Sequence, residues 1–412
     1  MKDSGIAWIG EIPENWNLQR GKTLFRQRQS KGNAELVLLS ATQKQGMIPQ
    51  EFVEGCVQVK EDTDLQTFKT VHKNDFVISL RSFQGGFEIS DYEGVCSPAY
   101  QVFYSLKDIC HSYWKYLFKS DGFISKMNSL TVGIREGKNI QYTDFANSLL
   151  TSPPLSEQQR IADYLDSQCA KIDSTITKTQ QIIEKLKAYK QSVIAEAVTK
   201  GLNPDVPMKD SGVEWIGKMP SHWKVCKFGV VASVKSNLVS PEKYPELPQV
   251  SPENIEKGSG KILPCQTVEE SGVISWNHLF YKGQILYSKI RPRLNKVTIA
   301  PFDGLCSADM YPIETSQDYD FIKYMMLADS FVEQVILVTE NRVKMPKINQ
   351  NELGQILVCI PNIDEQKQIA SYLDDKCARI DGYIAKKQEV IEKLTAYKKS
   401  LIFEVVTGKK EI

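Results

Sequence analysis

The chain has 412 residues, of which 42% are hydrophobic and 25% charged, proportions that are ordinary for a globular protein. At about 100–200 residues per domain, this length predicts two or three domains. A formal net charge of +1 excludes a polycation that binds nucleic acid by electrostatics alone, so a nucleic-acid site would have to be local.

Nine cysteines without a Cys-x-x-Cys pair exclude a disulfide scaffold and a zinc ribbon, and they favour a reducing compartment. No segment reaches the roughly 18 consecutive apolar residues that a membrane span requires. The start of the chain lacks the apolar core of a secretory signal. We therefore expect a cytoplasmic protein without membrane contact.

The sequence contains a tandem duplication. Segment 1–16 returns at 208–223, and both copies read Met-Lys-Asp-Ser-Gly, then Trp-Ile-Gly, a proline and a second tryptophan. Segment 157–199 returns at 365–407 with 26 of 43 positions identical, which is far above chance. Each copy is thus a variable part of about 150 residues, long enough for its own core, followed by a shared block.

The first variable part, residues 1–152, predicts a mixed domain of short strands and one or two helices. Residues 34–39 and 75–79 have the composition of strands, and residues 113–118 begin a helical run. The second variable part, residues 202–359, has matching features at 284–288 and 321–326, and Gly-x-Cys-Ser occurs in both, at 94–97 and 304–307. The fold class predicted for each part is α+β.

The shared blocks predict two long helices, at 153–201 and 360–412. Prolines at 153, 154 and 361 precede them, Ser156 and Asp364 are candidate N-caps, and Gly201 and Gly408 follow the helix ends. Apolar residues recur at steps of four and three, the pattern of a coiled-coil seam. The seam residues are Leu165, Cys169, Ile172, Ile176, Ile183, Leu186 and Val193 in the first helix, and Leu373, Cys377, Ile380, Ile384, Ile391, Leu394 and Leu401 in the second.

Polar residues interrupt the seam at matching places, Thr179 and Lys190 in the first helix and Lys387 and Lys398 in the second. Such residues cost stability but fix register. Because each helix leaves one variable part and leads away from it, pairing of the seams predicts an antiparallel coiled coil with approximate two-fold symmetry and neighbouring chain termini.

Local charge indicates where the variable parts could contact nucleic acid. Arginine and lysine neutralise phosphates, while arginine, asparagine and glutamine can form paired hydrogen bonds with base edges. In the first part the candidates are Gln43, Lys44, Arg81, Ser82, Gln84, Arg135, Lys138 and Asn139. In the second part they are Lys289, Arg291, Arg293, Asn295, Lys296, Arg342, Lys344 and Lys347. The competing interpretation, solvated loop charges, remains open for any single residue.

Motifs of catalysis are missing from the sequence. The four histidines have no metal-ligand spacing, and neither a phosphate-binding Gly-x-x-x-x-Gly-Lys-Ser/Thr loop nor a dinucleotide Gly-x-Gly-x-x-Gly motif occurs. Ser152-Pro153-Pro154-Leu155 lacks the asparagine and the aromatic residue of an amino-methyltransferase loop. We therefore expect no catalytic residues, no metal site and no bound cofactor.

Three motifs resemble those of type I restriction–modification specificity subunits. They are the duplicated opening Lys-Asp-Ser-Gly-x-x-Trp-Ile-Gly-x-x-Pro-x-x-Trp, the segment Pro-Pro-Leu-Ser-Glu-Gln-Gln-Arg-Ile-Ala-Asp-Tyr-Leu-Asp at 153–166 with its repeat at 361–374, and Gly-Gln-Ile-Leu-Tyr-Ser-Lys-Ile-Arg-Pro at 283–292. The resemblance extends over nearly the whole chain.

This resemblance implies a non-catalytic subunit with two target recognition domains, each reading one half of a bipartite site in double-stranded DNA. It implies that the helices set the distance between the half-sites, and that two modification subunits with S-adenosylmethionine bind the chain. Two restriction subunits that use ATP and magnesium can join them. Two alternatives stay open: a system with methylation only, and a coiled-coil adaptor between proteins without DNA specificity.

Overall fold

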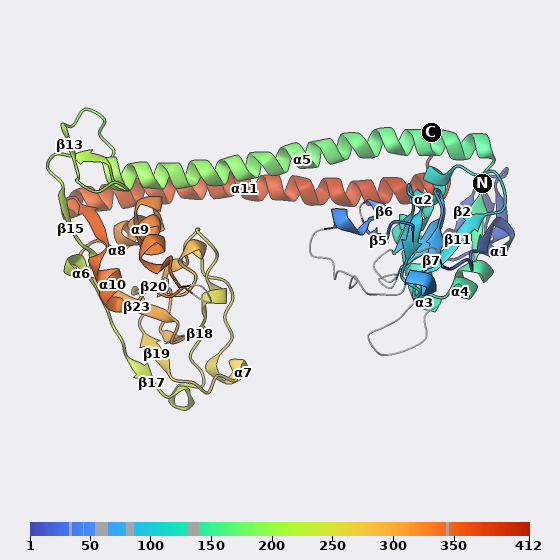
Figure 1. Cartoon of the computed structure of the whole chain (residues 1–412). Helices are drawn as coiled ribbons and strands as arrows, with labels where there is room; N and C mark the ends of the chain where they lie inside the picture. The colour runs from blue at the N-terminus through green and yellow to red at the C-terminus, as the bar shows by residue number, and fades with distance from the viewer. Residues whose placement is uncertain (33–34, 44, 54–64, 80–85, 131–139, 343–345) are drawn as a thin grey trace. The chain divides into compact units, whose positions relative to one another are not determined.

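The computed structural model describes residues 1–32, 35–43, 45–53, 65–79, 86–130, 140–342 and 346–412 (Figure 1). The chain divides into two compact units. Unit 1 comprises Met1–Thr179 and Glu389–Ile412, and unit 2 comprises Gln180–Gln388. Each unit therefore contains one variable part together with a stretch of both long helices. Among the described residues, no helix combines the length and the apolar character that crossing a membrane requires.

Unit 1 alternates short strands with short helices before its long helix. Its strands are β1 (Lys2–Asp3), β2 (Glu11–Ile12), β3 (Asn17–Arg20), β4 (Phe25–Gln27), β5 (Leu39–Thr42), β6 (Gly46–Pro49), β7 (Lys69–Val71), β8 (Phe76–Ile78), β9 (Phe87–Ile89), β10 (Gly94–Cys96), β11 (Gln101–Ser105) and β12 (Leu149–Ser152). Its helices are α1 (Gly21–Leu24), α2 (His111–Lys119), α3 (Asp121–Leu130), α4 (Tyr142–Asn147) and the first part of α5 (Leu155–Lys200).

Unit 2 repeats this order. Its strands are β13 (Met208–Asp210), β14 (Lys218–Pro220), β15 (Lys224–Lys227), β16 (Ala232–Val234), β17 (Leu238–Val239), β18 (Gln249–Val250), β19 (Asn277–Phe280), β20 (Ile285–Ser288), β21 (Val297–Ile299), β22 (Gly304–Cys306), β23 (Met310–Thr315) and β24 (Leu357–Ile360). Its helices are α6 (Phe228–Val231), α7 (Val268–Ser271), α8 (Tyr319–Leu327), α9 (Asp329–Thr339), α10 (Gln350–Gln355) and the first part of α11 (Ile363–Val406).

Both units are built on the same antiparallel sheet of four strands. Its order is β4-β11-β8-β9 in unit 1 and β16-β23-β20-β21 in unit 2. The registers correspond, since Phe76 lies opposite Phe103 in the first sheet and Ile285 opposite Ile313 in the second. The central strands β8 and β20 are buried along their whole length, as expected for short apolar strands inside a core. The two variable parts thus share an α+β frame, as predicted.

The surroundings of the frame differ between the units. In unit 2 the second sheet has four strands, β17-β19-β22-β18. In the described residues of unit 1 the corresponding pair β7–β10 is extended by single bridges, Lys31 to Lys69 and Leu38 to Val95, and β5 pairs with β6. The glycine that recurs in β10 and β22 has a steric cause. A Cβ atom would lie 2.4 Å from the Val37 oxygen at Gly94 and 2.6 Å from the Pro248 oxygen at Gly304. Both positions therefore require glycine.

The predicted elements at 75–79, 284–288, 113–118 and 321–326 are confirmed as β8, β20, α2 and α8. The strand predicted at 34–39 is wrong in its bounds, because β5 begins only at Leu39. Its partner β6 ends at Pro49, opposite Leu39. Before Leu39, Leu38 forms only a single parallel bridge with Val95 of β10, and Ala34 lies outside the described residues. The side chain of Val37 is 51% exposed, which shows that the apolar run is not a core strand throughout.

The helices α5 and α11 pair in an antiparallel coiled coil, and Figure 1 shows them side by side. In unit 1 the core joins Leu165 of α5 to Leu401 of α11. In unit 2 it joins Val198 to Leu373. The predicted seam residues Cys169, Ile172, Ile183, Cys377 and Ile380 are buried, and Ile176, Leu186, Val193, Ile384, Ile391 and Leu394 are half-buried.

The predicted N-caps Ser156 and Asp364 are wrong, because both residues already lie in the first turn. At α11 the Asn362 side chain accepts a hydrogen bond from the Glu365 amide at 3.0 Å, so the cap is Asn362. At α5 the Pro154 carbonyl accepts from the Glu157 amide at 2.9 Å. The predicted C-terminal glycines are confirmed: Gly201 and Gly408 have φ of 74° and 71°, the left-handed conformation that favours glycine.

The shared block also holds each variable part on its helix. The buried Gln158 side chain accepts hydrogen bonds from the Cys110 amide (3.1 Å) and from the Trp114 indole (3.2 Å), and it donates to the Pro153 carbonyl. In addition, Tyr116 donates to Asp166 at 2.7 Å. We call this arrangement, in either unit, the glutamine clamp.

In unit 2 the clamp is Gln366. Its side chain accepts from the Asp318 amide at 3.0 Å and donates to Gln317 and to the Pro361 carbonyl. Here Tyr324 donates to Asp374 at 2.6 Å. The high identity between the two copies of the block therefore has a structural cause, because each copy performs the same docking.

Two of the predicted polar interruptions of the seam form ion pairs between the helices. Lys190 lies 2.7 Å from Asp381 in unit 2, and Lys398 lies 2.7 Å from Asp173 in unit 1. Along α5 from Asp173 to Lys190, the partner moves back along α11 from Lys398 to Asp381, as antiparallel pairing requires. The two pairs differ in burial, since the Lys190 side chain is 8% exposed and that of Lys398 27%.

We expect Asp381→Asn to lower the free energy of unfolding of unit 2 by about 1–3 kcal/mol, because it leaves the buried Lys190 ammonium without a counter-charge. Asp173→Asn is the matched control, and its cost should be smaller because water reaches Lys398. Urea unfolding of both variants measures the difference. Equal costs would show that the burial of the lysine does not determine the strength of the pair.

Candidate nucleic-acid interface

Half of the candidate contact residues lie outside the part of the chain that the structure describes. They are Lys44, Arg81, Ser82, Gln84, Arg135, Lys138, Asn139 and Lys344. In unit 1 this leaves Gln43, whose side chain is exposed in the turn between β5 and β6. Most of the described candidate residues therefore belong to unit 2.

The structure brings together the two basic segments that the sequence analysis identified in unit 2. Ile290 and Lys347 form an antiparallel bridge. The Arg291 amide donates to the Pro346 carbonyl at 2.9 Å, and the Ile348 amide donates to the Lys289 carbonyl at 3.0 Å. Segments 289–291 and 346–348 thus lie side by side and extend from the end of the central strand β20. Segments more than 50 residues apart in sequence form one basic surface.

Several basic side chains of this surface are held by carboxylates. Arg342 makes a two-pronged ion pair with Glu352 and also donates to the Lys347 carbonyl. This bonding lowers the pKa of the Glu352 carboxyl and raises that of the Arg342 guanidinium. Lys347 forms an ion pair with Asp309 at 2.9 Å. Arg342 and Lys347 therefore stabilise the segment that they belong to.

Asn295 and Lys296, at the end of the basic segment 289–296, also stabilise the structure around them. Asn295 donates to the Leu327 carbonyl at 2.8 Å, and Lys296 donates to the Pro252 carbonyl at 2.6 Å. The turn itself, Pro292–Leu294, is a single 3-10 turn with the buried Pro292 at its start. These contacts fix residues 291–296 against the rest of unit 2.

Arg291 and Arg293 are different, because both side chains are exposed. Neither makes an ion pair or a side-chain hydrogen bond with any residue in the part of the chain that the structure describes. Arg291 and Asn295 have φ of 48° and 42°, a backbone conformation that residues other than glycine rarely adopt. Such strain is retained when the surrounding contacts enforce it, and it is common at binding sites. We call residues 291–295 the arginine turn.

Lys289 lies at the base of the arginine turn. Its amine is 5.2 Å from the centre of the Tyr311 ring, a cation–π contact. Burial lowers the pKa of Lys289, and the neighbouring Lys347 lowers it further, while Asp309 raises it. The carboxylates Asp309 and Glu352 were not singled out by the sequence analysis, and neither was the buried His278, whose pKa is lowered by burial and then by the charge of Lys289. These three residues are far from the basic segments in sequence or carry no positive charge, so the sequence provided no reason to place them at this surface.

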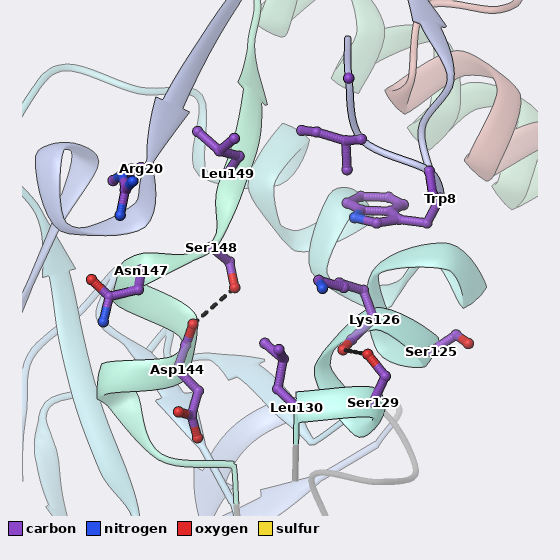
Figure 2. A pocket seen from close by; sticks show the side chains of 13 residues that line it. Trp8, Arg20, Ser125, Lys126, Ser129, Leu130, Asp144, Asn147, Ser148 and Leu149 are labelled. Carbon is purple, nitrogen blue, oxygen red and sulfur yellow. Dashed lines mark hydrogen bonds between the residues drawn. The ribbon is translucent and has the colours of Figure 1, made fainter.

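Unit 1 has a hollow of about 700 Å³ between its opening segment and helices α3 and α4. Figure 2 shows Trp8 and Lys126 on one side and Arg20, Asn147 and Asp144 on the other. The drawn hydrogen bonds run from Ser129 to the Lys126 carbonyl and from Ser148 to the Asp144 carbonyl. Among the described residues that line the hollow there is neither a candidate contact residue nor a serine that is hydrogen-bonded to a basic side chain.

The described residues contain no group of three or more histidine, cysteine or carboxylate side chains that could hold a metal ion.

The family model for the type I restriction modification DNA specificity domain matches the chain twice, at residues 7–188 and 220–393. The chain is 33% identical over 350 residues to the type I restriction enzyme EcoDI specificity subunit of Escherichia coli, with 80% of this chain and 77% of that protein covered. It is 25% identical over 310 residues to the EcoBI specificity subunit of the same species, covering 70% of this chain and 63% of that protein.

Two solved structures share the fold at 14% identity. One is a chain from work on complex assembly and conformational transition of the type I R-M system, with a TM-score of 0.71 and coverage of 97% of this chain and 100% of that one. The other is the HsdS subunit from Thermoanaerobacter tengcongensis, with a TM-score of 0.51 and coverage of 97% and 98%. On the two family matches and the identity to the EcoDI subunit, the chain belongs to the family of type I restriction–modification specificity subunits.

Proposed function

We propose that each variable part of this specificity subunit reads one half of a bipartite site in double-stranded DNA, and that the chain itself catalyses no reaction. The observation that carries the proposal is the pair of equivalent sheets with different chemistry around them. In unit 2 the frame presents the arginine turn, whose two guanidiniums have no partner among the described residues and suit phosphates and guanine edges. A shared frame with different surfaces is what reading two different sequences requires.

The same geometry separates residues that contact DNA from residues that support them. We assign Arg291 and Arg293 to DNA contact because their guanidiniums are exposed and available. Lys289 lies beside them and adds positive charge. Arg342, Lys347, Asn295 and Lys296 belong to the support, since their polar groups are already used within unit 2. For unit 1 we propose only that the loops carrying its candidate residues contact DNA.

Docking of two modification subunits is supported by exposed tyrosines that the duplication repeats. Tyr189 and Tyr397 occupy matching positions of α5 and α11 and are 55% and 52% exposed. In unit 2, Tyr189 and Tyr372 line a hollow of about 550 Å³ whose wall includes the exposed Leu202 and Met208. Equivalent exposed aromatics in both units suit two copies of the same partner. The methyl donor S-adenosylmethionine would then belong to the modification subunits, and ATP and magnesium to restriction subunits where these join.

The direct test is methylation at base resolution. Genomic DNA of a host that carries this chain with its modification subunits should show one bipartite methylated motif, and deletion of this chain alone should abolish it. The purified chain without partners should methylate no DNA. If the complex bound all duplexes equally, the chain would be an adaptor between proteins and the proposal would be wrong.

Substitution in the arginine turn tests the assignment of unit 2. We expect Arg291→Gln and Arg293→Gln to weaken binding of the complex to its site. The plot of log affinity against log salt concentration should become less steep, by about 0.9 for each phosphate contact that is removed. Lys227→Gln, an exposed charge on β15, is the matched control and should change neither quantity. Arg342→Gln should mainly lower the melting temperature. An unchanged salt slope in both arginine variants would contradict the assignment.

We further propose that the helices determine the spacing between half-sites. Insertion of seven residues after Thr179 in α5 and of seven at the facing position near Glu392 in α11 lengthens the coiled coil by about 10 Å while nearly preserving its seam. The preferred number of base pairs between half-sites should then change, as measured by selection from duplexes with variable spacers. Retention of the original spacer would exclude this role of the helices.

A further inference from the structure

Three large apolar side chains are exposed at one end of the second sheet of unit 2. Ile274 is 92% exposed, Trp276 61% and Leu238 45%. Trp276 immediately precedes β19, and Leu238 of β17 pairs with His278 of β19. Leu238 thus lies opposite His278, and Trp276 is the residue directly before the strand that carries His278. Ile274 belongs to the loop that leads into Trp276. We call these three residues the apolar tip.

The apolar tip adjoins the basic surface of unit 2. His278 pairs with Cys306 of β22, and the chain continues from there to Asp309, whose carbonyl accepts from the Lys289 amide at 3.0 Å. Burial lowers the pKa of His278, and the charge of Lys289 lowers it further. The strand end that carries Trp276 therefore also leads to Lys289 and the arginine turn.

Charge around the apolar tip is compatible with a nucleic acid on this side. The nearest acidic residues along the chain are Glu270 and Glu269 of α7, four and five residues before Ile274, and Glu242, four residues after Leu238. The Glu270 carboxylate accepts a hydrogen bond from the Thr267 amide at 2.9 Å and closes a capping box, so it has a local structural role. After Trp276, the next charged residues along the chain are basic, Lys282 and Lys289. An apolar tip on a strand that leads to basic residues matches a groove, where phosphates flank the apolar faces and methyl groups of bases.

Beneath the apolar tip, hydrogen-bonding capacity is left unused. Asn277 and His278 are 1% and 4% exposed, and in the described part of the chain nothing bonds to the Asn277 Oδ1 or the His278 Nδ1. Buried polar atoms without a partner are rare and call for a cause. Here they lie directly next to Trp276, where a bound molecule or a small shift of the loop could satisfy them.

Unit 1 has no equivalent of the apolar tip among its described residues. Strands β7 and β10 pair as β19 and β22 do, with Lys69 opposite Cys96 where unit 2 has His278 opposite Cys306. By this register Thr67 takes the place of Trp276. The apolar tip is therefore a property of one variable part, as expected for a feature that reads one half-site.

From these observations we propose that Trp276 and Ile274 make apolar contacts with the bases of the half-site read by unit 2, against thymine methyl groups or an opened base step. This rests on the proposed function. The proposed contact is uncharged. It therefore contributes to sequence preference but not to the salt dependence of binding.

The test uses the complete complex of this chain with its modification subunits and a panel of duplexes, each with one base pair of the recognised site replaced. We expect Trp276→Ala to weaken binding of the intact site by about ten-fold, a reduction typical of removing one aromatic side chain that packs on bases. Ile274→Ser should have a smaller effect of the same kind. Preference should relax at one or two adjacent base pairs of one half-site, while the slope of log affinity against log salt stays unchanged.

Val230→Ser is the matched control, because Val230 is an apolar residue of α6 that is 73% exposed and lies outside the apolar tip. It should leave affinity and preference unchanged. Trp276→Phe should retain most of the binding, which separates loss of the contact from loss of folding, and the melting temperatures of all variants provide the second check.

Unchanged affinity and preference in both tip variants would overturn this proposal while leaving the proposed function in place. The same holds if Trp276→Ala impaired only assembly with the modification subunits, since the apolar tip would then bind protein. A wild-type complex without sequence preference would overturn the proposed function and this proposal together.

Discussion

The glutamine clamp is the interaction on which each unit depends. A single buried amide at the start of a long helix, Gln158 or Gln366, is bonded on both of its polar atoms and joins the helix to the variable part. Buried amides must be satisfied in this way, because an unpaired one would cost about 1–3 kcal/mol. The clamp therefore fixes the orientation of the sheet on the helix, and the position of the arginine turn follows from the sheet.

Basic residues in unit 2 divide into two groups by the partners that they have. Arg342 and Lys347 neutralise Glu352 and Asp309 and so build the surface, whereas Arg291 and Arg293 remain available on it. A count of positive charge would treat all four alike. The division explains how a chain of nearly zero net charge can present a cationic surface at one place without repulsion among the supporting residues.

Periodicity and repetition were enough to predict the architecture, but the candidate interface could be predicted only as a set of segments. The heptad pattern and the duplicated block predicted two antiparallel helices, although Asn362 and Asp364 are equally plausible caps by composition and only the backbone decides between them. The proximity of residues 289–291 and 346–348 depends on a bridge between segments remote in sequence. Trp276 gave no signal either, since an aromatic residue before a strand is normally part of a core.

The glutamine clamp has a consequence for inheritance. In unit 1 the Gln158 side chain accepts hydrogen bonds from an indole and from a backbone amide. In unit 2 the Gln366 side chain accepts one from a backbone amide and donates one to a second glutamine. The helix therefore accepts variable parts that present different donors. A gene segment encoding one variable part could be exchanged by recombination within the flanking repeats and still fold onto the existing helix. Under the proposed function, new combinations of half-sites would then arise in single steps, without any change in the residues that hold the protein together.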